Sequence, residues 1–261
     1  MNHDTDTSRP NVALVTGGSR GIGAEIVRAL HAAGFAVCYT YVRAAAAAGD
    51  LQRELGTERV AALHCELADS ETLPRIVQDC IARYGALDVL VNNAAIFAEN
   101  RFDAADYAAW RAGWERTFAV NVFGAADLAW LALRAMRANA PDGYGTRGRI
   151  INVTSRASHR GELAFADYGA SKAALANLTR SIARSCASAG IVAFNVAPGF
   201  IETEMAAAAL AELGDEIRAE IPGGRVGTPA EVARIIAFFA SGAGDYATGT
   251  TVDVNGASYV R

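Results

Sequence analysis

The stretch NVALVTGGSRGIGAEIVRAL, residues 11–30, joins a short apolar run to a glycine-rich turn and then to an amphipathic segment. The apolar run is uninterrupted and rich in branched side chains, which is typical of a buried parallel strand. Glycines allow a tight turn and let the backbone approach an anion, while the helix that follows offers unpaired N–H groups. This strand–turn–helix setting predicts a dinucleotide-binding site, and a glycine-rich connection without a ligand is the alternative.

Six further apolar runs begin near residues 35, 59, 87, 149, 191 and 250, and each is nearly continuous in hydrophobicity. Such runs indicate strands that helices cover on both faces. Helices are expected between them, at 21–33, 44–56, 70–84, 106–139, 166–189, 203–220 and 229–240. The pattern therefore predicts an α/β fold: one doubly wound domain over residues 11–261, with a seven-stranded, mostly parallel sheet. Residues 1–10 are expected to form a disordered tail.

Charge and composition narrow the classes of partner. The formal net charge is −4 with both signs interspersed, so the chain has no basic stripe of the kind that follows nucleic acid. No apolar stretch approaches the roughly 18 residues of a membrane span, and the first ten residues lack the apolar core of a signal peptide. We expect a cytoplasmic protein that binds neither nucleic acid nor a membrane. The four cysteines are far apart and are expected to be buried thiols, with no metal site.

The end of the second predicted strand, YTYVRAAAAAG at 39–49, bears on the choice of cofactor. An acidic residue there would bind the ribose 2′-hydroxyl of NAD, but Tyr41 occupies the place and Arg43 follows it. Arg20, in the glycine turn, can reach the same group. Two guanidiniums without a carboxylate favour the 2′-phosphate of NADP over NAD, although solvated arginines are the alternative. Glu66, after the third strand, is placed to accept from the adenine amine.

Tyr168 and Lys172 lie four residues apart, on one face of a predicted helix. Lys172 is the only lysine in a chain with 23 arginines, which indicates a chemical requirement at this position. A tyrosine hydroxyl is a poor acid–base group at neutral pH unless a nearby cation lowers its pKa, and a lysine supplies that charge. Ser155 ends the fifth strand, at the edge where doubly wound sheets bind ligands. It can donate to a substrate carbonyl, or simply cap the next segment.

Asn92 and Asn93 follow the fourth strand directly. Their amides can tie the ends of neighbouring strands together, and Asn92 is expected near the adenosine ribose. For Asn93 a purely structural role, satisfying the backbone of the turn, is the alternative.

Together these motifs resemble the classical short-chain dehydrogenase/reductases. The resemblance rests on TGxxxGxG at 16–23, NNAx at 92–95, Asn121 in AVNVFG, Ser155, YxxxK at 168–172 and NVAPGFIET at 195–203. It extends over about residues 10–258, with the motifs in family order. It implies one Rossmann-type domain and hydride transfer between a nicotinamide and a carbonyl or carbinol carbon.

The resemblance also implies roles for individual residues. Tyr168 would be the general acid–base, Lys172 would lower its pKa and hold the nicotinamide ribose, and Ser155 would orient the carbonyl. Asn121 would interrupt its long helix and help to hold a proton-relay water. The residues expected to contact the cofactor are Gly17, Ser19, Arg20, Gly21, Ile22, Gly23, Tyr41, Arg43, Glu66, Leu67, Asn93, Ala94, Ala95, Tyr168, Lys172, Pro198, Gly199, Ile201 and Thr203.

The chain departs from the family pattern at three places. Ala95 replaces the usual glycine of NNAG, Glu66 replaces a common aspartate, and VDVNGA at 252–257 replaces the more usual DGG. These changes bear on the fit of the nucleoside and on contacts between subunits. None of them touches the predicted acid–base residues.

The substrate is less well specified by the sequence. The phrase NVAPGFIETEM at 195–205 resembles bacterial 3-oxoacyl-(acyl carrier protein) reductases, and sugar and other secondary-alcohol dehydrogenases share it. The polar loop RASHRGELAFAD at 156–167 equally allows a small polar or anionic carbonyl compound.

Arg134, Arg137 and Arg184 can form a docking surface for an acidic carrier protein, or a solvated helix face. A homotetramer or homodimer, formed through the long helices and the last strand, is implied. A nucleotide-sensing scaffold without catalysis is the alternative of another class.

Overall fold

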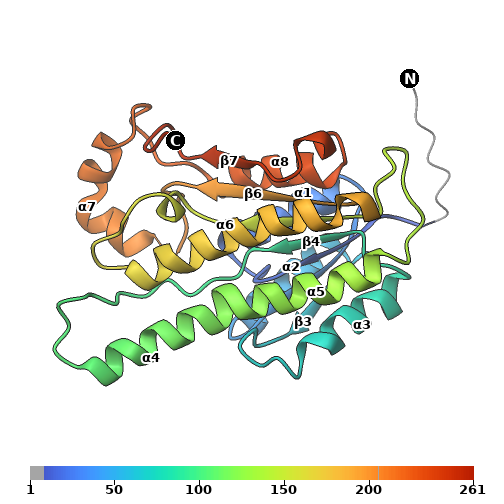
Figure 1. Cartoon of the computed structure of the whole chain (residues 1–261), viewed down its shortest axis with the longest axis horizontal. Coiled ribbons are helices and arrows are strands. Elements are labelled where there is room, and N and C mark those ends of the chain that lie inside the picture. The colour runs from blue at the N-terminus through green and yellow to red at the C-terminus, as the bar shows by residue number, and fades with distance from the viewer. Residues whose placement is uncertain (1–8, 205) are drawn as a thin grey trace.

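Seven parallel strands form the central sheet of the computed structural model, which describes residues 9–204 and 206–261. The strand order is β3-β2-β1-β4-β5-β6-β7 (Figure 1). The strands are β1 Val12–Val15, β2 Ala36–Tyr41, β3 Val60–His64, β4 Val89–Asn92, β5 Gly148–Val153, β6 Ile191–Pro198 and β7 Thr251–Val254. The predicted seven-stranded parallel sheet is confirmed. Residues 1–8 of the predicted tail lie outside the described residues.

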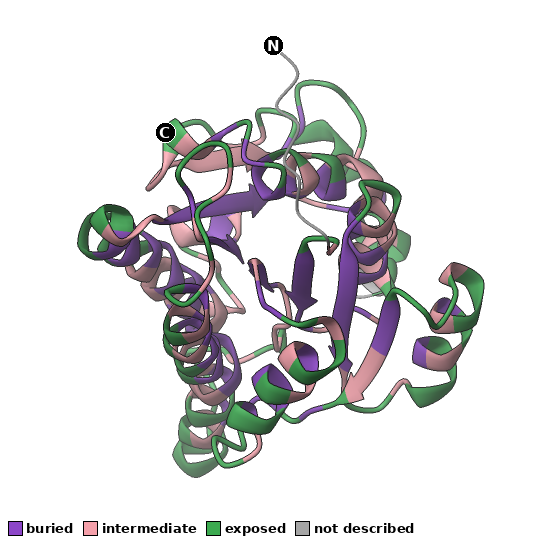
Figure 2. Ribbon diagram, turned by 90° about the vertical axis from the view of Figure 1, so that its right-hand side faces the viewer, coloured by how far each residue is buried: buried purple, intermediate pink, exposed green. Residues whose placement is uncertain are grey.

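Helices cover both faces of this sheet. They are α1 Gly21–Ala32, α2 Ala45–Leu55, α3 Leu73–Tyr84, α4 Tyr107–Phe118, α5 Ala125–Met136, α6 Ala166–Cys186, α7 Ala207–Ala219 and α8 Pro229–Ala240. Alternate residues of β1 enter different cores: Ala13 and Val15 pack with α1, α2 and α8, while Val12 and Leu14 pack with α3, α5 and α6. Figure 2 shows the buried strands between the two helical layers. Burial on both faces explains the unbroken apolar runs of the sequence.

The long helix predicted over 106–139 is not continuous. α4 and α5 are joined by a π-helical turn, Ala119–Gly124, which contains Asn121, the residue expected to interrupt this helix. Within the described residues, the run Tyr107–Met136 is the one helical stretch long and apolar enough to cross a membrane by those criteria alone. Here α5 packs against α3, and α4 packs against α6. A core helix passes the same test, so the run is weak evidence for a membrane span.

All seven strands point the same way, so the loops that follow β1, β4, β5 and β6 meet at the carboxyl edge of the sheet. These loops carry about half of the predicted site residues. α7 lies beyond the same edge (Figure 1). It begins at Ala207, later than the predicted 203, and has a non-helical residue at Leu213.

Candidate active site

The glycine-rich turn after β1 has the backbone that its sequence predicts. Gly17 and Gly21 adopt positive φ angles of 64° and 53°, a region that side chains other than glycine rarely enter. A Cβ on Gly23 would lie 2.0 Å from the Gly17 carbonyl oxygen, so only glycine allows α1 to pack this close to the turn. The N-terminus of α1 has neither a side-chain cap nor an acidic residue in its first turn. Its first N–H groups therefore fit an anionic group such as a pyrophosphate.

Asn93 ties the ends of β1 and β4 together. Its side-chain nitrogen donates to the carbonyl oxygens of Thr16 at 2.9 Å and Gly17 at 3.2 Å. In return, the Thr16 hydroxyl accepts from the backbone N–H of Asn93 at 2.9 Å and of Ala94 at 3.0 Å. These contacts support the structural alternative for Asn93. A cofactor contact by the same residue stays a prediction.

Asn92 belongs to a buried ladder of polar side chains that the sequence did not reveal. Its amide donates to Asn152 Oδ1 at 2.9 Å, which supports its expected role in tying neighbouring strands together, and its place near the adenosine ribose stays a prediction. The ladder continues from Asn152 to the Thr179 hydroxyl at 2.7 Å, from Thr179 to Asn195 at 2.6 Å, and from Asn195 to Thr251 at 3.2 Å. The three asparagines and Thr251 share one register across β4, β5, β6 and β7. Neighbouring strands and α6 supply partners for the amide nitrogens of the three asparagines, while Asn92 Oδ1 is buried without a hydrogen-bond partner among the described residues.

The residues predicted to bind adenosine lie near the ends of β2 and β3. Tyr41 is half-buried and meets the ring of His64 edge-on, with 5.6 Å between the centroids. Arg43 and Glu66 are exposed, whereas the Leu67 side chain is buried in the core. Arg20 does not point freely into solvent: its Nη1 lies 3.2 Å from the Glu204 carboxylate. Both side chains of this pair are exposed, so a phosphate can displace the contact at little cost.

The segment after β6 reaches back to the glycine turn. A Cβ on Gly199 would lie 2.7 Å from Asn255, which fixes a glycine directly after Pro198. Further along, the Thr203 methyl lies 3.5 Å from the position that a Cβ on Gly21 would occupy. The structure thus brings together the two segments predicted to hold the two ends of the cofactor.

The predicted catalytic side chains meet where β5 ends and α6 begins. The Ser155 hydroxyl accepts from Ala157 N–H at 3.1 Å and caps a short 3-10 turn, Arg156–Ser158. Lys172 is almost completely buried, and its Nζ donates to the Val153 carbonyl at 2.8 Å. The same nitrogen lies 5.7 Å from the centroid of the Tyr168 ring. Ser155 is close enough to hydrogen-bond the Tyr168 side chain, so the three residues form one site.

Burial dominates the electrostatics of this site. It lowers the pKa of Lys172 to about 8, because the ammonium is removed from water. It also raises the pKa of Tyr168 to about 12, and only the hydrogen bond with Ser155 offsets the rise, while the nearby Glu162 carboxylate adds to it. The predicted lowering of the Tyr168 pKa by Lys172 is therefore not present in this structure. The Lys172 ammonium donates to the backbone of β5, and desolvation is the largest effect on the pKa of Tyr168.

Asn121 lies inside the π-helical turn, which confirms that the long helix is interrupted there. Its Oδ1 accepts from the Ile96 N–H at 2.8 Å, and its Nδ2 donates to the Ile96 carbonyl at 3.0 Å and to Ser171 Oγ at 3.0 Å. The Ser171 hydroxyl donates to the Tyr168 carbonyl at 2.7 Å. Asn121 thus links the loop after β4 to the turn of α6 that carries Tyr168. Its part in a proton relay stays a prediction.

Asp167 is a site residue that sequence reasoning missed. It is buried beside Tyr168 and accepts from the Thr117 hydroxyl at 2.7 Å, from Asn100 at 3.3 Å and from the Tyr168 N–H at 2.9 Å. These bonds join the first turn of α6 to α4 and so orient Tyr168. Acidic residues are common in the first turn of a helix, so the sequence gives no signal for Asp167. Only its burial, which the structure shows, distinguishes it.

Two different groups of side chains lie near Tyr168, the predicted acid–base residue. Phe97 stacks on Phe165 at 4.1 Å and meets the Tyr168 ring edge-on at 4.8 Å, between centroids. The other group is an ion-pair cluster formed by Arg156, Arg160, Glu162 and Glu220. Arg160 contacts Glu162 at 3.6 Å and Glu220 at 3.8 Å, and Arg156 contacts Glu220 at 3.4 Å. This cluster joins the loop after β5 to the residue that follows α7.

Comparison with known proteins agrees with this geometry. The family model described as enoyl-(acyl carrier protein) reductase matches residues 17–257. Acetoacetyl-CoA reductase of Shinella zoogloeoides is 35% identical over 249 residues, covering 95% of this chain and 98% of the relative. The 3-oxoacyl-(acyl-carrier-protein) reductase FabG of Staphylococcus aureus strain Mu50 is 34% identical over 250 residues, with 95% and 98% covered.

Solved structures give the same result. A short-chain dehydrogenase/reductase from Brucella melitensis, described as a glucose/ribitol dehydrogenase, matches with a TM-score of 0.87 and 30% identity, covering 96% of this chain and 97% of the other. A short-chain dehydrogenase/reductase from Serratia marcescens BCRC 10948 matches with a TM-score of 0.86 and 32% identity, covering 97% and 99%.

Proposed function

The chain belongs to the short-chain dehydrogenase/reductase family of oxidoreductases, and on that premise we propose that it is an NADP(H)-dependent enzyme that reduces a carbonyl compound to an alcohol. The proposed substrate is a 3-oxoacyl thioester or a small ketone, because relatives named acetoacetyl-CoA reductase and 3-oxoacyl-(acyl-carrier-protein) reductase match nearly the whole chain. The observation that carries the proposal is the meeting of Ser155, Tyr168 and Lys172 at the carboxyl edge of the sheet.

The proposed mechanism follows from the protonation states of these side chains. A pKa of about 12 keeps Tyr168 protonated at neutral pH, which is the state that a general acid needs. Its hydroxyl would donate to the carbonyl oxygen, which the Ser155 hydroxyl holds in place, and the buried ammonium of Lys172 would stabilise the phenolate that results. The nicotinamide cofactor, when bound, supplies the hydride. In the reverse direction Tyr168 must first lose its proton, so alcohol oxidation would be favoured by high pH.

The proposed cofactor fits the residues around the carboxyl edge. The glycine turn and the open N-terminus of α1 would hold the pyrophosphate, and the Pro198–Gly199 segment would hold the nicotinamide end. Arg20 and Arg43 would pair with the 2′-phosphate of NADP. The exposure of both arginines, and a tyrosine instead of an acidic residue at position 41, support this choice over NAD.

Arg43→Ala is expected to raise the dissociation constant for NADPH about 10-fold, because one charge-assisted hydrogen bond to the phosphate is lost. Affinity for NADH should stay within a factor of two, since NADH lacks that phosphate. Titration of protein fluorescence with each cofactor measures both constants. Arg53→Ala is the matched control, because Arg53 is exposed on the neighbouring α2 and pairs with Asp50. Equal weakening of NADH and NADPH would contradict the assignment of Arg43.

The substrate class is tested by following NADPH oxidation with an acetoacetyl thioester, a diketone and a ketose, and NADP⁺ reduction with secondary alcohols. We expect the acetoacetyl thioester to give the highest kcat/KM. A preference for the ketose or the alcohols would support a sugar or alcohol dehydrogenase instead. Tight NADPH binding without turnover of any compound would support a nucleotide-sensing scaffold and overturn the proposal.

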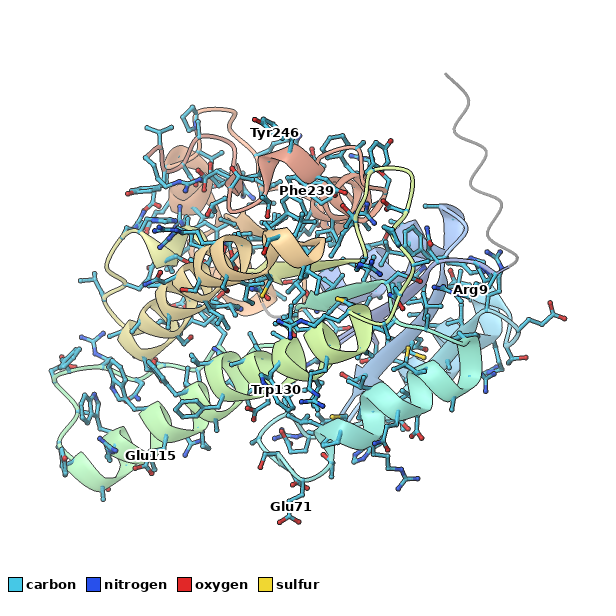
Figure 3. All side chains as sticks on the ribbon, turned by 45° about the vertical axis from the view of Figure 1, so that its right-hand side comes forward. Arg9, Glu71, Glu115, Trp130, Phe239 and Tyr246 are labelled. Atoms are coloured by element: carbon cyan, nitrogen blue, oxygen red, sulfur yellow. The ribbon has the colours of Figure 1, made fainter. Side chains whose placement is uncertain are left out.

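We further propose a cytoplasmic homotetramer or homodimer, assembled through the long helices and the last strand. Phe123 and Trp130 support this: they are 61% and 57% exposed and lie seven residues apart, on one face of the α4–α5 run (Figure 3 labels Trp130). Arg134 lies over the Trp130 ring at 5.0 Å and belongs to the arginines proposed to receive an acidic carrier protein. If copies of the chain cover this face, Arg134 is less accessible to a carrier.

A further inference from the structure

Arg156 is a buried cation next to the proposed catalytic serine. It follows Ser155 directly and is the first residue of the short 3-10 turn, and its side chain is only 6% exposed. The guanidinium lies over the ring of Phe200, with 4.3 Å between its carbon and the ring centroid. Phe200 in turn follows the Pro198–Gly199 segment proposed to hold the nicotinamide. Arg156 therefore lies between the residues that would bind the reacting carbonyl and those that would bind the reacting ring.

The hydrogen-bonding capacity of Arg156 is not used up by the protein. Its Nη1 is buried and has no hydrogen-bond partner among the residues that the structure describes. Its contact with the Glu220 carboxylate is long, at 3.4 Å, and the Glu220 side chain is 52% exposed. Burial, followed by the neighbouring Arg160, lowers the pKa of Arg156, so the loss of hydration outweighs the opposing effects of Glu162 and Glu220. Buried donors are nearly always paired in native proteins, so an acceptor from outside the chain is the natural partner.

The charges around Arg156 indicate what kind of acceptor fits. Arg156 and Arg160 are balanced by Glu162 and Glu220, so the ion-pair cluster carries no net charge. The Glu162 and Glu220 carboxylates would repel a negatively charged group. A neutral carbonyl oxygen is not repelled and needs only the N–H of Nη1 that the described residues leave unpaired. In a 3-oxoacyl compound the second carbonyl lies two carbons from the reacting one. Arg156 directly follows Ser155 in the chain, so Ser155 would hold the first oxygen and Arg156 would serve the second.

We propose that Arg156 is a specificity-determining residue, whose Nη1 donates a hydrogen bond to the second carbonyl oxygen of a 1,3-dicarbonyl substrate. The inference rests on the proposed function, because it assumes that Ser155 and Tyr168 bind the reacting carbonyl. The bond fixes the direction in which the substrate chain leaves the site. It makes the enzyme selective for 3-oxoacyl compounds over ketones that have one carbonyl.

The test compares two substrates that differ only at the second carbonyl. One is the neutral thioester S-acetoacetyl-N-acetylcysteamine, and the other is the thioether in which a CH₂ group replaces the thioester carbonyl. We expect the wild-type protein to prefer the thioester by about 10- to 100-fold in kcat/KM, the range for one hydrogen bond from a charged donor. Arg156→Met should remove most of this preference by lowering kcat/KM for the thioester, with less than about a threefold change for the thioether ketone. Arg156→Lys should restore part of it.

Arg160→Met is the matched control, because Arg160 shares Glu220 with Arg156 but is more exposed. It should leave the ratio of the two kcat/KM values unchanged. Equal losses on both substrates in Arg156→Met would show a structural role and overturn the inference. So would a wild-type preference below about threefold, a measurement that does not depend on the folding of any variant. If the wild-type protein oxidises NADPH with neither ketone nor any other carbonyl compound, the proposed function itself fails.

Discussion

Tyr168→Phe is expected to lower kcat for carbonyl reduction by about 10²- to 10⁴-fold, the range for loss of a positioned general acid. The substitution removes one hydroxyl and keeps the ring, so the edge-on contact with Phe97 at 4.8 Å remains. The dissociation constant for NADPH should change by less than about threefold, because the proposed phosphate contacts lie at the glycine turn and the end of β2. Steady-state NADPH oxidation and equilibrium cofactor titration measure the two effects separately.

Tyr259→Phe is the matched control for this prediction. The Tyr259 hydroxyl donates to the His159 carbonyl at 3.3 Å, near the C-terminus and outside the proposed acid–base residues. Its removal should leave kcat within about twofold of the parent value. If Tyr168→Phe turns over near the parental rate with any substrate, Tyr168 is not the general acid.

Lys172→Met is expected to lower kcat about 10²- to 10³-fold and, at the same time, to stabilise the protein at pH 7. Activity falls because the positive charge proposed to stabilise the phenolate is lost. Stability rises because the buried ammonium is costly: a pKa of about 8, against an ordinary value of 10.5, corresponds to about 3 kcal/mol at neutral pH. The lost hydrogen bond from this charged donor to Val153 offsets about 2 kcal/mol, which leaves a gain of about 1 kcal/mol in the free energy of unfolding.

The stabilising effect of Lys172→Met should decrease as the pH rises. The unfolded chain keeps its lysine proton up to about pH 10.5, whereas the folded protein loses it near pH 8, so the cost of Lys172 is complete below pH 8. As the pH rises from 8 towards 10, the folded parent is relieved of the charge. The difference in unfolding free energy between Lys172→Met and the parent should therefore shrink over that interval. Denaturant titrations at pH 7, 8.5 and 10 measure it.

Lys172→Arg tests whether a positive charge alone at this position is sufficient for activity. An arginine keeps a positive charge, but its larger planar group must fit into a space where Lys172 is only 2% exposed. We expect this variant to lose activity as Lys172→Met does and, unlike it, to lose stability as well. Full activity in Lys172→Arg would show that any cation serves, and would contradict the reason inferred for the single lysine of the chain.

Much of the fold was predictable because its signals are local. The unbroken apolar runs predicted the seven strands, because a strand that is buried on both faces is apolar throughout. The positive φ angles of Gly17 and Gly21 explain why glycines occupy the turn. The placement of Ser155 at a strand end, and of Tyr168 one turn before Lys172, also follows from local spacing. These features depend on residues that are close in the chain, so a pattern can reveal them.

The sequence by itself determined the parallel α/β fold, the glycine turn and the grouping of serine, tyrosine and lysine at one edge of the sheet. Only the tertiary structure decided that burial raises the pKa of Tyr168 and that Asn92 joins a ladder inside the sheet. It also decided that the Arg156 guanidinium is buried with one nitrogen unpaired within the described part of the chain. The physical reason is that desolvation and hydrogen-bond satisfaction depend on everything packed around a group. For Arg156 that includes Phe200 and Glu220, which lie 44 and 64 residues further along the chain.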